Sequence, residues 1–597
     1  MYIQVKIRKD FMNYKLIDGS INDIDDPTKT ILLNRGIKDW KDYLNLSEDC
    51  IYDFELLDNI RIAVDCFIDH IDNKDNIHII VDSDVDGYTS GSMIYRYIKK
   101  LDKEANVTYS LHTKKQHGIS KDIVIPKNCN LLIIPDAGSN DVKQCKSLNE
   151  NGVDIIILDH HICDEKNDYA IIINNQLCNY PNKNFCGAGI VYKFLKAVDE
   201  ELWNDYADDM LDMVALGNIS DVMDMREFET RYYVDCGLKN IKSKLFKALI
   251  KKQSFSMKDI INITSVQFYI TPILNAMIRI GNSEEKELLF RAFIETDEVF
   301  DYKKRGATET IEETIYDRAA RLCSNAKARQ TKEVSKDVSL IKEIIDKEKI
   351  NRNKVMFINV SDILGETLTG LVAIKLAEEY NRPCILLRTI KPKDGDEVLD
   401  YGGSCRNFDN SPLESLKQFL CSLSTFNFVQ GHDNAAGVSI PKNNIIKTIK
   451  LCNDKLADVD FSQYYRVDFD IDYQDLFVGF IKNIDSIKNL FGQGVKEPLV
   501  YVSNIPVYSD DILIMGKEFN SWKVINDSIA FVKFSVDKEK DKILTSYNNL
   551  SDSEKENRIY LGDISIVGTV SINNYNNILT PQIIIKDYEF TKSEGVG

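Results

Sequence analysis

The chain of 597 residues lacks the sequence features of membrane and secreted proteins. It has no run of 18 apolar residues, and its first residues carry no signal-peptide pattern. Its thirteen cysteines include no paired Cys-x-x-Cys spacing, so we expect neither a disulfide framework nor a zinc site. We therefore expect a soluble protein that contacts no membrane. The frequent use of Asn, Lys and Ile is typical of proteins from AT-rich genomes. We therefore expect a protein in the cytoplasm of an AT-rich bacterium, or a phage protein in the host cytoplasm.

The chain also lacks the excess of basic residues that is typical of nucleic-acid-binding proteins. Its 75 Lys and Arg are outnumbered by 93 Asp and Glu, for a net charge of −18. Total charge does not fix local charge, and residues 239–252 are rich in lysine. For that stretch a solvated helix face and a nucleic-acid contact are equally good interpretations. The acidic balance predicts that any binding of nucleic acid outside a confined channel is weak and salt-sensitive.

The length excludes a single core, and changes of hydrophobic period divide the chain. Strands alternating with helical patterns predict an α/β domain with a parallel sheet, and residues 308–349, without Pro or Gly, predict a long connecting helix. A second α/β domain and then short β-like runs, typical of a small barrel, follow. The expected ranges are 1–55 (lead-in), 56–240 (parallel sheet), 241–350 (helical connector), 351–455 (second α/β domain) and 456–597 (barrel).

The most informative stretch sets three carboxylates at alternate positions after the apolar run 77–81, namely Asp82, Asp84 and Asp86. A strand that ends in acids puts them at the carboxyl edge of a sheet, where open α/β folds build their sites. The acids converge only if the chain turns there, as Gly87 permits. Because crowded acids repel one another, the group predicts a cation site. Taken alone, it is also compatible with a solvated or calcium-binding loop.

Three further segments carry acids or imidazoles at corresponding places. Asp136 follows the run 131–135, the triplet Asp159-His160-His161 follows the run 155–158, and Asp221 ends an apolar, helix-like stretch. Individually, Asp136 could cap the next helix and Asp221 could be a solvated acid at a helix end. Together the four segments favour a shared site. Carboxylates with one or two histidines suit Mn²⁺ or Mg²⁺ better than zinc, so we expect a centre of two such ions.

In this order and at these intervals the four segments resemble the motifs of the DHH phosphoesterase superfamily, and within it the RecJ-like single-strand DNA exonucleases. The similarity extends over nearly the whole chain. Further elements that resemble this family are residues 33–37, 174–176, 187–189, 272–276, 431–437, 490–494 and the pair Glu497-Pro498.

The resemblance implies a DHH domain, a DHH-associated domain and a C-terminal oligonucleotide-binding (OB) fold. It implies metal-dependent 5′-to-3′ hydrolysis of single-stranded DNA to mononucleotides in DNA recombination and repair. We assign as candidate metal ligands Asp82, Asp84, Asp86, Asp136, His160 and Asp221. By resemblance Asp136 bridges the ions. Asp159 orients a histidine or caps a helix, and His161 contacts the scissile phosphate or supports a ligand.

A 5′ exonuclease must also recognise a strand end. By resemblance Ser404 and Arg406 bind the terminal 5′-phosphate, and His432 and Arg279 approach the substrate backbone. Without the family pattern, Arg406 would be assigned to a surface salt bridge and His432 to a packed core. Three aromatic residues of the expected barrel could stack on bases or belong to its core, namely Tyr501, Phe519 and Trp522.

Some positions depart from the family pattern, such as Gln430 in place of the first Gly of Gly-Gly-His. Two other functions therefore stay open: a phosphodiesterase for nanoRNA or cyclic dinucleotides, and a non-catalytic nucleic-acid-binding scaffold. The interior RecJ-like elements argue against the first, and the complete ligand set against the second. The expected partners are single-stranded DNA and a single-strand-binding protein or a helicase, with the chain itself a monomer.

Overall fold

The structure is a computed structural model that describes residues 12–592, apart from residues 115, 122, 164, 305, 307, 391–398, 463 and 576. The chain forms two compact units. One comprises Lys41–Glu333 with Phe491–Val495, and the other Met1–Trp40, Val334–Leu490 and Lys496–Gly597. Among the described residues, no helix is both long and apolar enough to span a membrane.

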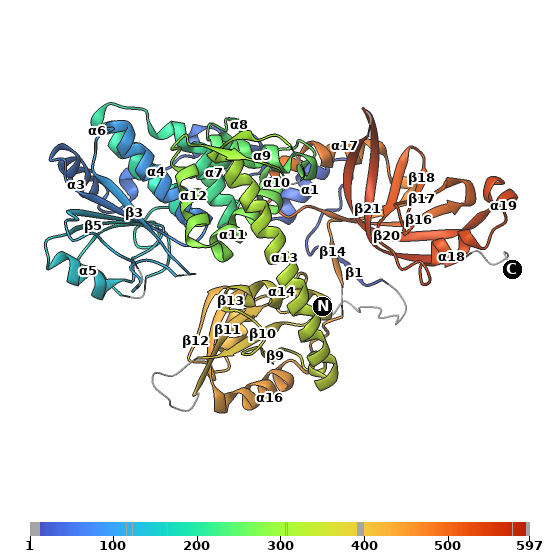
Figure 1. Cartoon of the computed structure of the whole chain (residues 1–597). Helices are drawn as coiled ribbons and strands as arrows, with labels where there is room; N and C mark the ends of the chain where they lie inside the picture. Colours follow the sequence, from blue (N-terminus) through green and yellow to red (C-terminus); the bar gives the residue numbers. More distant parts are fainter. Residues whose placement is uncertain are drawn as a thin grey trace. The chain divides into compact units, whose positions relative to one another are not determined.

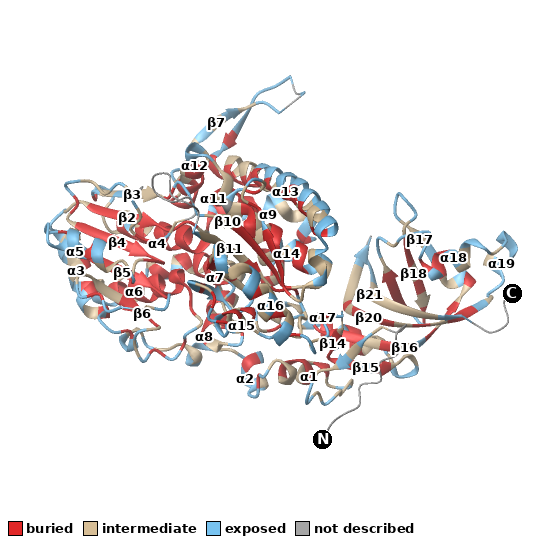
Figure 2. Cartoon of the chain, turned by 90° about the horizontal axis from the view of Figure 1, so that it is seen from below, coloured by how far each residue is buried: buried red, intermediate tan, exposed pale blue. Residues whose placement is uncertain are grey.

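The first unit is built on a five-stranded parallel sheet in the order β3-β2-β4-β5-β6. Strands β2 and β4 are buried along their whole length (Figure 2), as expected for a parallel sheet covered by helices on both faces. In Figure 1, helices α3, α4 and α6 cover one face and α5 the other. The bounds are α3 Ile60–Asp72, β2 Ile77–Val81, α4 Val85–Leu101, β3 Val107–Leu111, β4 Leu131–Pro135, α5 Val142–Asn149, β5 Asp154–Asp159, β6 Ile171–Asn174 and α6 Gly187–Leu202.

Helices follow the sheet and complete this unit. They include a π-helix at Val266–Ile270, directly before α11. The predicted long helix is α13, whose 34 residues run from Ile315 to Glu348 and pass into the second unit at Val334. The other bounds are α2 Trp40–Leu44, α7 Leu211–Ser220, α8 Phe228–Lys239, α9 Lys244–Met257, α10 Ile263–Ser265, α11 Thr271–Ile280, α12 Ser283–Phe293, β7 Val299–Tyr302 and β8 Ile311–Thr314.

The second unit contains a five-stranded mixed sheet in the order β12-β13-β11-β10-β9. Strands β9 and β10 are parallel, and the remaining neighbours are antiparallel. This sheet confirms the second α/β fold expected from the sequence. The bounds are β9 Met356–Asn359, α14 Thr369–Tyr380, β10 Cys384–Thr389, β11 Asp400–Arg406, α15 Leu416–Cys421, β12 Phe428–His432, β13 Ala435–Pro441 and α16 Ile445–Lys455.

The C-terminal part of the second unit is a seven-stranded mixed sheet in the order β15-β16-β20-β21-β19-β18-β17. It stands where a small barrel was expected, and the pairings of the described residues leave β15 and β17 at its edges. Strands β20 and β21 form a long hairpin (Figure 1). The bounds are β15 Phe469–Asp472, α17 Val478–Ser486, β16 Leu499–Tyr508, β17 Ile512–Met515, β18 Ser521–Asn526, β19 Ile529–Lys533, α18 Lys542–Asn548, α19 Asp552–Glu556, β20 Tyr560–Tyr575 and β21 Ile578–Lys592.

The first described residues belong to this second unit. Strand β1 (Tyr14–Leu16) pairs in parallel with β14 (Tyr465–Val467), and α1 (Pro27–Asn34) follows. Directly after α1, Arg35 forms a buried ion pair with Asp468, with 2.7 Å between Nη1 and Oδ1. The expected lead-in of 55 residues therefore contributes to both units, with the division at Trp40.

Candidate metal centre

Three of the predicted acids lie at one edge of the parallel sheet. Asp82 directly follows β2, Asp136 directly follows β4, and Asp159 is the last residue of β5. These strands are neighbours and run in the same direction, so their carboxyl ends meet. All three side chains are almost completely buried. Burial without a counter-charge is costly for carboxylates, so this edge needs a cation or bound protons.

The turn between β2 and α4 brings Asp82 and Asp84 together. Asp84 caps α4, and its Oδ1 accepts a hydrogen bond of 3.0 Å from the amide of Gly87. Gly87 lies inside the first turn of the helix, and a Cβ there would come within 2.6 Å of the Cβ of Asp82. The glycine is therefore required for close packing, whereas the predicted turn is made by the residues before it. Burial raises the pKa of Asp82 to about 6, with Asp84 adding to the rise and His117 opposing it.

Asp136 stands at the centre of the cluster in an unusual backbone conformation, with φ at 67°. Helix α5 begins at Val142 after Asp141, so Asp136 caps no helix. Its Oδ1 is buried without a hydrogen-bond partner among the described residues. A Cβ at Gly187 would lie 2.5 Å from the Cβ of Asp136, so only glycine fits there. Burial and the surrounding carboxylates raise the pKa of Asp136 well above its ordinary value.

His160 faces three acids through one nitrogen. Its Nε2 lies 3.2 Å from Asp136 Oδ1, 3.5 Å from Asp221 Oδ2 and 3.9 Å from Asp86 Oδ2. This nitrogen is buried and makes no hydrogen bond within the described part of the chain. Burial lowers the pKa of His160, which favours a neutral ring that can ligate a cation. Asp221 directly follows α7, and burial with neighbouring acids raises its pKa well above the ordinary value.

Asp86 is held by another helix. Its Oδ2 accepts a hydrogen bond of 2.6 Å from the amide of Gly187, and its Oδ1 accepts one of 3.0 Å from Ala188. These amides begin α6, whose positive dipole end favours a carboxylate. Asp86 is therefore fixed in place, with its Oδ2 3.9 Å from His160 Nε2.

Asp159 and His161 form a separate pair. Asp159 Oδ1 lies 2.8 Å from His161 Nδ1 and accepts hydrogen bonds from the amides of His160 and His161, at 2.7 and 3.1 Å. Burial would raise the pKa of Asp159, but these bonds and the nearby imidazoles hold it below its ordinary value. Burial likewise opposes the charged form of His161, yet the bond to Asp159 raises its pKa to about 9. Residues 162–170 contain no helix in their described part, which leaves Asp159 no helix to cap.

The predicted residues form three overlapping groups, in each of which the ligand atoms lie within 4.8 Å of one another. The groups are Asp82, Asp84 and Asp136; Asp86, His160 and Asp221; and Asp136, His160 and His161. Asp136 and His160 each belong to two groups. Oxygen-rich donors with one or two imidazoles, and two orphaned donor atoms at the point of overlap, fit hard divalent cations such as Mn²⁺ or Mg²⁺.

Two histidines beside Asp82 were not predicted as site residues. His117 Nδ1 lies 2.7 Å from Asp82 Oδ2, and His112 Nε2 lies 3.8 Å from Asp82 Oδ1. The amide of Gly118 also donates to Asp82 Oδ1 at 3.3 Å. The sequence carried two signals: two of the seven histidines lie within six positions, and residues 112–118 stand where RecJ-like proteins have an Arg-x-x-Glu-Gly-Tyr-Gly element, here much reduced.

The predicted substrate contacts lie in both units. Arg279, in the last turn of α11, is close enough to Asp84 for that carboxylate to raise its pKa, although burial lowers it more. In the other unit, Arg406 of β11 and His432 of β12 both pair with Ala435 of the strand between them. Ser404 stands two positions before Arg406, so both point to one face of the sheet, and its Oγ lies 2.9 Å from Thr369 Oγ1. Arg406 Nη1 donates to the carbonyl of Cys405 at 2.7 Å.

The three aromatic candidates for base stacking differ in exposure. Trp522 is completely buried and belongs to the core. Tyr501 stacks on Tyr14 with 3.7 Å between ring centroids. Phe519 is 66% exposed, so of the three it has the most surface free for a base.

Comparison with known proteins adds to this geometry. Residues 76–218 match the DHH family, N-terminal domain, and residues 467–587 match the RecJ OB domain. The chain is 40% identical over 587 residues to YorK of the SPbeta prophage in Bacillus subtilis (strain 168), which is named a candidate single-strand DNA-specific exonuclease. This match covers 98% of the present chain and 99% of YorK.

More distant relatives are RecJ proteins as well. The single-stranded-DNA-specific exonuclease RecJ of Bacillus subtilis (strain 168) is 26% identical over 561 residues, which cover 91% of this chain and 65% of that protein. The crystal structure of RecJ from Thermus thermophilus in complex with Mn²⁺ has the same fold, with a TM-score of 0.67 at 16% identity over 98% of this chain and 79% of that one. A second structure of that RecJ is a complex with Mg²⁺ and has a TM-score of 0.62, at 16% identity over 98% of this chain and 78% of that one. The chain thus belongs to the DHH family, in its RecJ-like branch with a RecJ OB domain.

Proposed function

We propose that this chain is a metal-dependent exonuclease that hydrolyses single-stranded DNA from the 5′ end to mononucleotides, in DNA recombination and repair. The observation that carries the proposal is the buried cluster in which Asp136 Oδ1 and His160 Nε2 have no hydrogen-bond partner among the described residues. YorK, which matches 98% of this chain and is named a candidate single-strand DNA-specific exonuclease, supports the substrate and the reaction in this proposal. A scaffold would have no need to keep such donors buried and unsatisfied.

The residues that would hold two Mn²⁺ or Mg²⁺ ions are Asp82, Asp84, Asp86, Asp136, His160 and Asp221. Bound ions of this kind lower the pKa of water and neutralise charge on the attacked phosphate and on the departing oxygen. Asp136 and His160 each belong to two of the three groups, and Asp136 is the candidate for the bridging ligand because a carboxylate offers two oxygens where an imidazole nitrogen offers one lone pair. The backbone amides of Gly187 and Ala188 hold Asp86 in position from the start of α6.

We assign His161 to the scissile phosphate. Its side chain is 52% exposed, and its Nδ1 is engaged by Asp159, so Nε2 is the nitrogen available to a substrate. An imidazole held in this way donates a hydrogen bond to a phosphate oxygen from a fixed direction. Since Nδ1 already faces Asp159, His161 ligates a cation only through Nε2, in competition with this role.

For strand-end selection we assign Ser404 and Arg406 to the terminal 5′-phosphate, and His432 to the substrate backbone. The hydroxyl and the guanidinium lie on β11 and the imidazole on β12, with only β13 between these strands, and all three are donors that phosphate oxygens accept. A Cβ at Gly370 would lie 2.5 Å from the guanidinium of Arg406, so the chain keeps space for this side chain. Arg279, near Asp84, is the candidate for a phosphate closer to the reacting bond.

The test is digestion of single-stranded DNA labelled at the 5′ or the 3′ end, with Mn²⁺ or Mg²⁺, by the full chain and by Asp136→Asn. Asparagine tolerates positive φ, so the variant should fold while losing one ligand charge. We expect 5′-labelled mononucleotide as the first product and a loss of at least about 100-fold in rate for the variant. Asp168→Asn, at an exposed acid paired with Lys166, is the matched control and should retain full rate.

Release of label from the 3′ end first would contradict the proposed polarity. Cleavage of dinucleotides but not of longer strands would favour the small-substrate phosphodiesterase. Undiminished hydrolysis by Asp136→Asn would contradict the site. DNA binding without hydrolysis by the folded wild type would favour the scaffold.

A further inference from the structure

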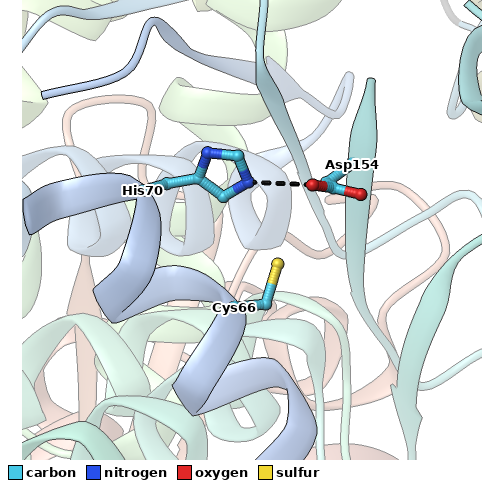
Figure 3. A group of neighbouring side chains, drawn as sticks. All are labelled: Cys66, His70 and Asp154. Carbon is cyan, nitrogen blue, oxygen red and sulfur yellow. Dashed lines mark hydrogen bonds and ion pairs between the residues drawn. The ribbon is translucent and has the colours of Figure 1, made fainter. Parts of the chain in front are cut away.

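A second cluster of metal-ligating side chains lies in the parallel-sheet unit, away from the acidic edge. It consists of Cys66 and His70 on α3 and Asp154 at the start of β5 (Figure 3). Their ligand atoms lie within 4.8 Å of one another. His70 Nε2 is 3.1 Å from Asp154 Oδ2, and the sulfur of Cys66 points toward this pair. Three donors from two elements therefore converge on one point.

The local structure explains why they meet. Cys66 and His70 are four residues apart in a helix, so they stand one above the other on the same face. Helix α3 buries Ile60, Ala63, Val64 and Phe67, which leaves the flank with Cys66 and His70 only partly covered. Asp154 is exposed at the amino end of β5, at the other end of that strand from Asp159. The cluster is thus separate from the candidate metal centre by the length of a strand.

The carboxylate of Asp75 orients the His70 ring so that its other nitrogen can bind a cation. Asp75 Oδ2 lies 2.8 Å from His70 Nδ1, so Nδ1 carries the proton and Nε2 faces Cys66 and Asp154. Histidines that bind metals in proteins commonly donate their other nitrogen to a carboxylate in this way. The arrangement is therefore the one expected around an imidazole ligand, in addition to being an ion-pair network.

The charge and donor types restrict the cation. Burial raises the pKa of the Cys66 thiol to about 11, with Asp154 and Asp69 adding to the rise, so without a cation the thiol stays protonated. A bound divalent ion would favour the thiolate. A sulfur, an imidazole nitrogen and one carboxylate suit a borderline ion such as Zn²⁺, and a thiolate excludes Mg²⁺ and Ca²⁺.

We propose that Cys66, His70 and Asp154 bind one Zn²⁺ ion, with Asp75 orienting His70, and that this ion joins α3 to the amino end of β5. Zinc bonds of about 2.0 to 2.3 Å put tetrahedral ligands roughly 3.3 to 3.8 Å apart, so the donors need only small side-chain rotations. Water completes the coordination. The absence of Cys-x-x-Cys pairs predicts no zinc site in this chain. That rule misses this cluster, because residues as far apart as Cys66 and Asp154 form no recognisable spacing motif.

The test is titration of the metal-free full chain with Co²⁺, a spectroscopic substitute for zinc, followed by displacement with Zn²⁺. Cobalt bound to a thiolate gives a sulfur-to-metal charge-transfer band, which carboxylate and imidazole ligands do not produce. We expect this band at one equivalent, its loss in Cys66→Ser and its weakening in His70→Asn and Asp154→Asn. We also expect Zn²⁺ to raise the thermal midpoint of the wild type by about 5 °C and that of Cys66→Ser by less than half as much.

Two control variants separate this site from other thiols. Cys50 is also partly exposed with a thiol pKa near 11, and Cys50→Ser should leave the band unchanged. Cys186 adjoins Asp86 in the candidate metal centre, so Cys186→Ser tests whether the cobalt signal comes from there. A band lost in Cys186→Ser and kept in Cys66→Ser would overturn the proposal. Absence of any band in the folded wild type would overturn it too, leaving a His70–carboxylate ion pair.

Discussion

At the scale of residues, the carboxylates of the sheet edge differ in how their oxygens are used. Asp159 accepts hydrogen bonds from two backbone amides and from His161, and its other oxygen accepts one from the amide of Ser139 at 3.2 Å. Asp136 Oδ1, at the same edge, accepts none within the described chain. The first acid is therefore an anchor for neighbouring groups, and the second retains free lone pairs for a cation.

A buried histidine in the strand that leads to Asp82 predicts a pH effect on stability. His78 of β2 is 2% exposed, and its ring nitrogens lie 2.8 Å from Thr108 Oγ1 and 3.0 Å from Ser110 Oγ. Burial lowers its pKa from 6.5 to about 4. The unfolded chain then binds the proton more readily, so stability is complete above the unfolded pKa and falls as the pH drops toward 4.

We expect the wild type to lose about 2 kcal/mol more than His78→Gln in free energy of unfolding between about pH 7 and pH 5. Urea denaturation at the two pH values, followed by circular dichroism, measures this difference. Ser110→Ala keeps the buried imidazole and should keep the full pH dependence. Equal losses in wild type and His78→Gln would contradict the assignment.

At the scale of elements, a buried polar network joins α6, α8 and the segment between β6 and α6. Lys193 Nζ lies 2.7 Å from Glu229 Oε1, and both side chains are almost completely buried. Glu229 also accepts hydrogen bonds from Tyr180, at 2.7 Å, and from Asn182, at 3.0 Å. Helix α6 also carries the amides that donate to Asp86, so this network helps to hold in place the helix that positions a candidate metal ligand.

Removal of one charge of this pair leaves the other buried and uncompensated. We expect Lys193→Met to reduce the free energy of unfolding of this unit by roughly 3 to 5 kcal/mol. The double variant Lys193→Met with Glu229→Gln should recover part of the loss, because no net charge then remains buried. Denaturant titration checks both variants, and a loss below about 1 kcal/mol in the single variant would contradict a tightly coupled network.

At the scale of the whole molecule, a net charge of −18 has to be reconciled with a nucleic-acid substrate. If binding depends on a few cations in otherwise acidic surroundings, the affinity for single-stranded DNA should fall about tenfold between roughly 50 and 200 mM salt. Arg406→Gln should reduce the slope of log affinity against log salt by about 0.7, as expected for one lost phosphate contact. Fluorescence anisotropy with labelled oligonucleotides measures both quantities.

The matched control for this prediction is Lys166→Gln, at an exposed lysine that pairs with Asp168. It should leave the slope unchanged. An affinity that is independent of salt in the wild type would mean that stacking, on residues such as the exposed Phe519, dominates over phosphate contacts.

Much of the architecture could be predicted from the sequence, because the signals for strands and helices lie within short stretches of the chain. Apolar runs of four or five residues followed by acids predict where β2, β4 and β5 end, and parallel strands bring those ends together. A stretch without Pro or Gly predicts α13, and its 34 residues confirm that expectation. Hydrophobic periodicity and helix-breaking residues such as Pro and Gly act over a few neighbouring positions, so they can be recognised in the sequence alone.

Other features depend on contacts between distant segments, and only the tertiary structure determines them. The amides of Gly187 and Ala188 hold Asp86 from 101 and 102 positions away, and His117 reaches Asp82 over 35 positions. The convergence of Cys66 and His70 with Asp154 is of the same kind. Local sequence patterns were thus enough to predict the strands, the acids that follow them and the family. Which carboxylate oxygens accept hydrogen bonds and which stay free depends on packing, because burial and hydrogen bonding arise only when segments far apart in the chain meet.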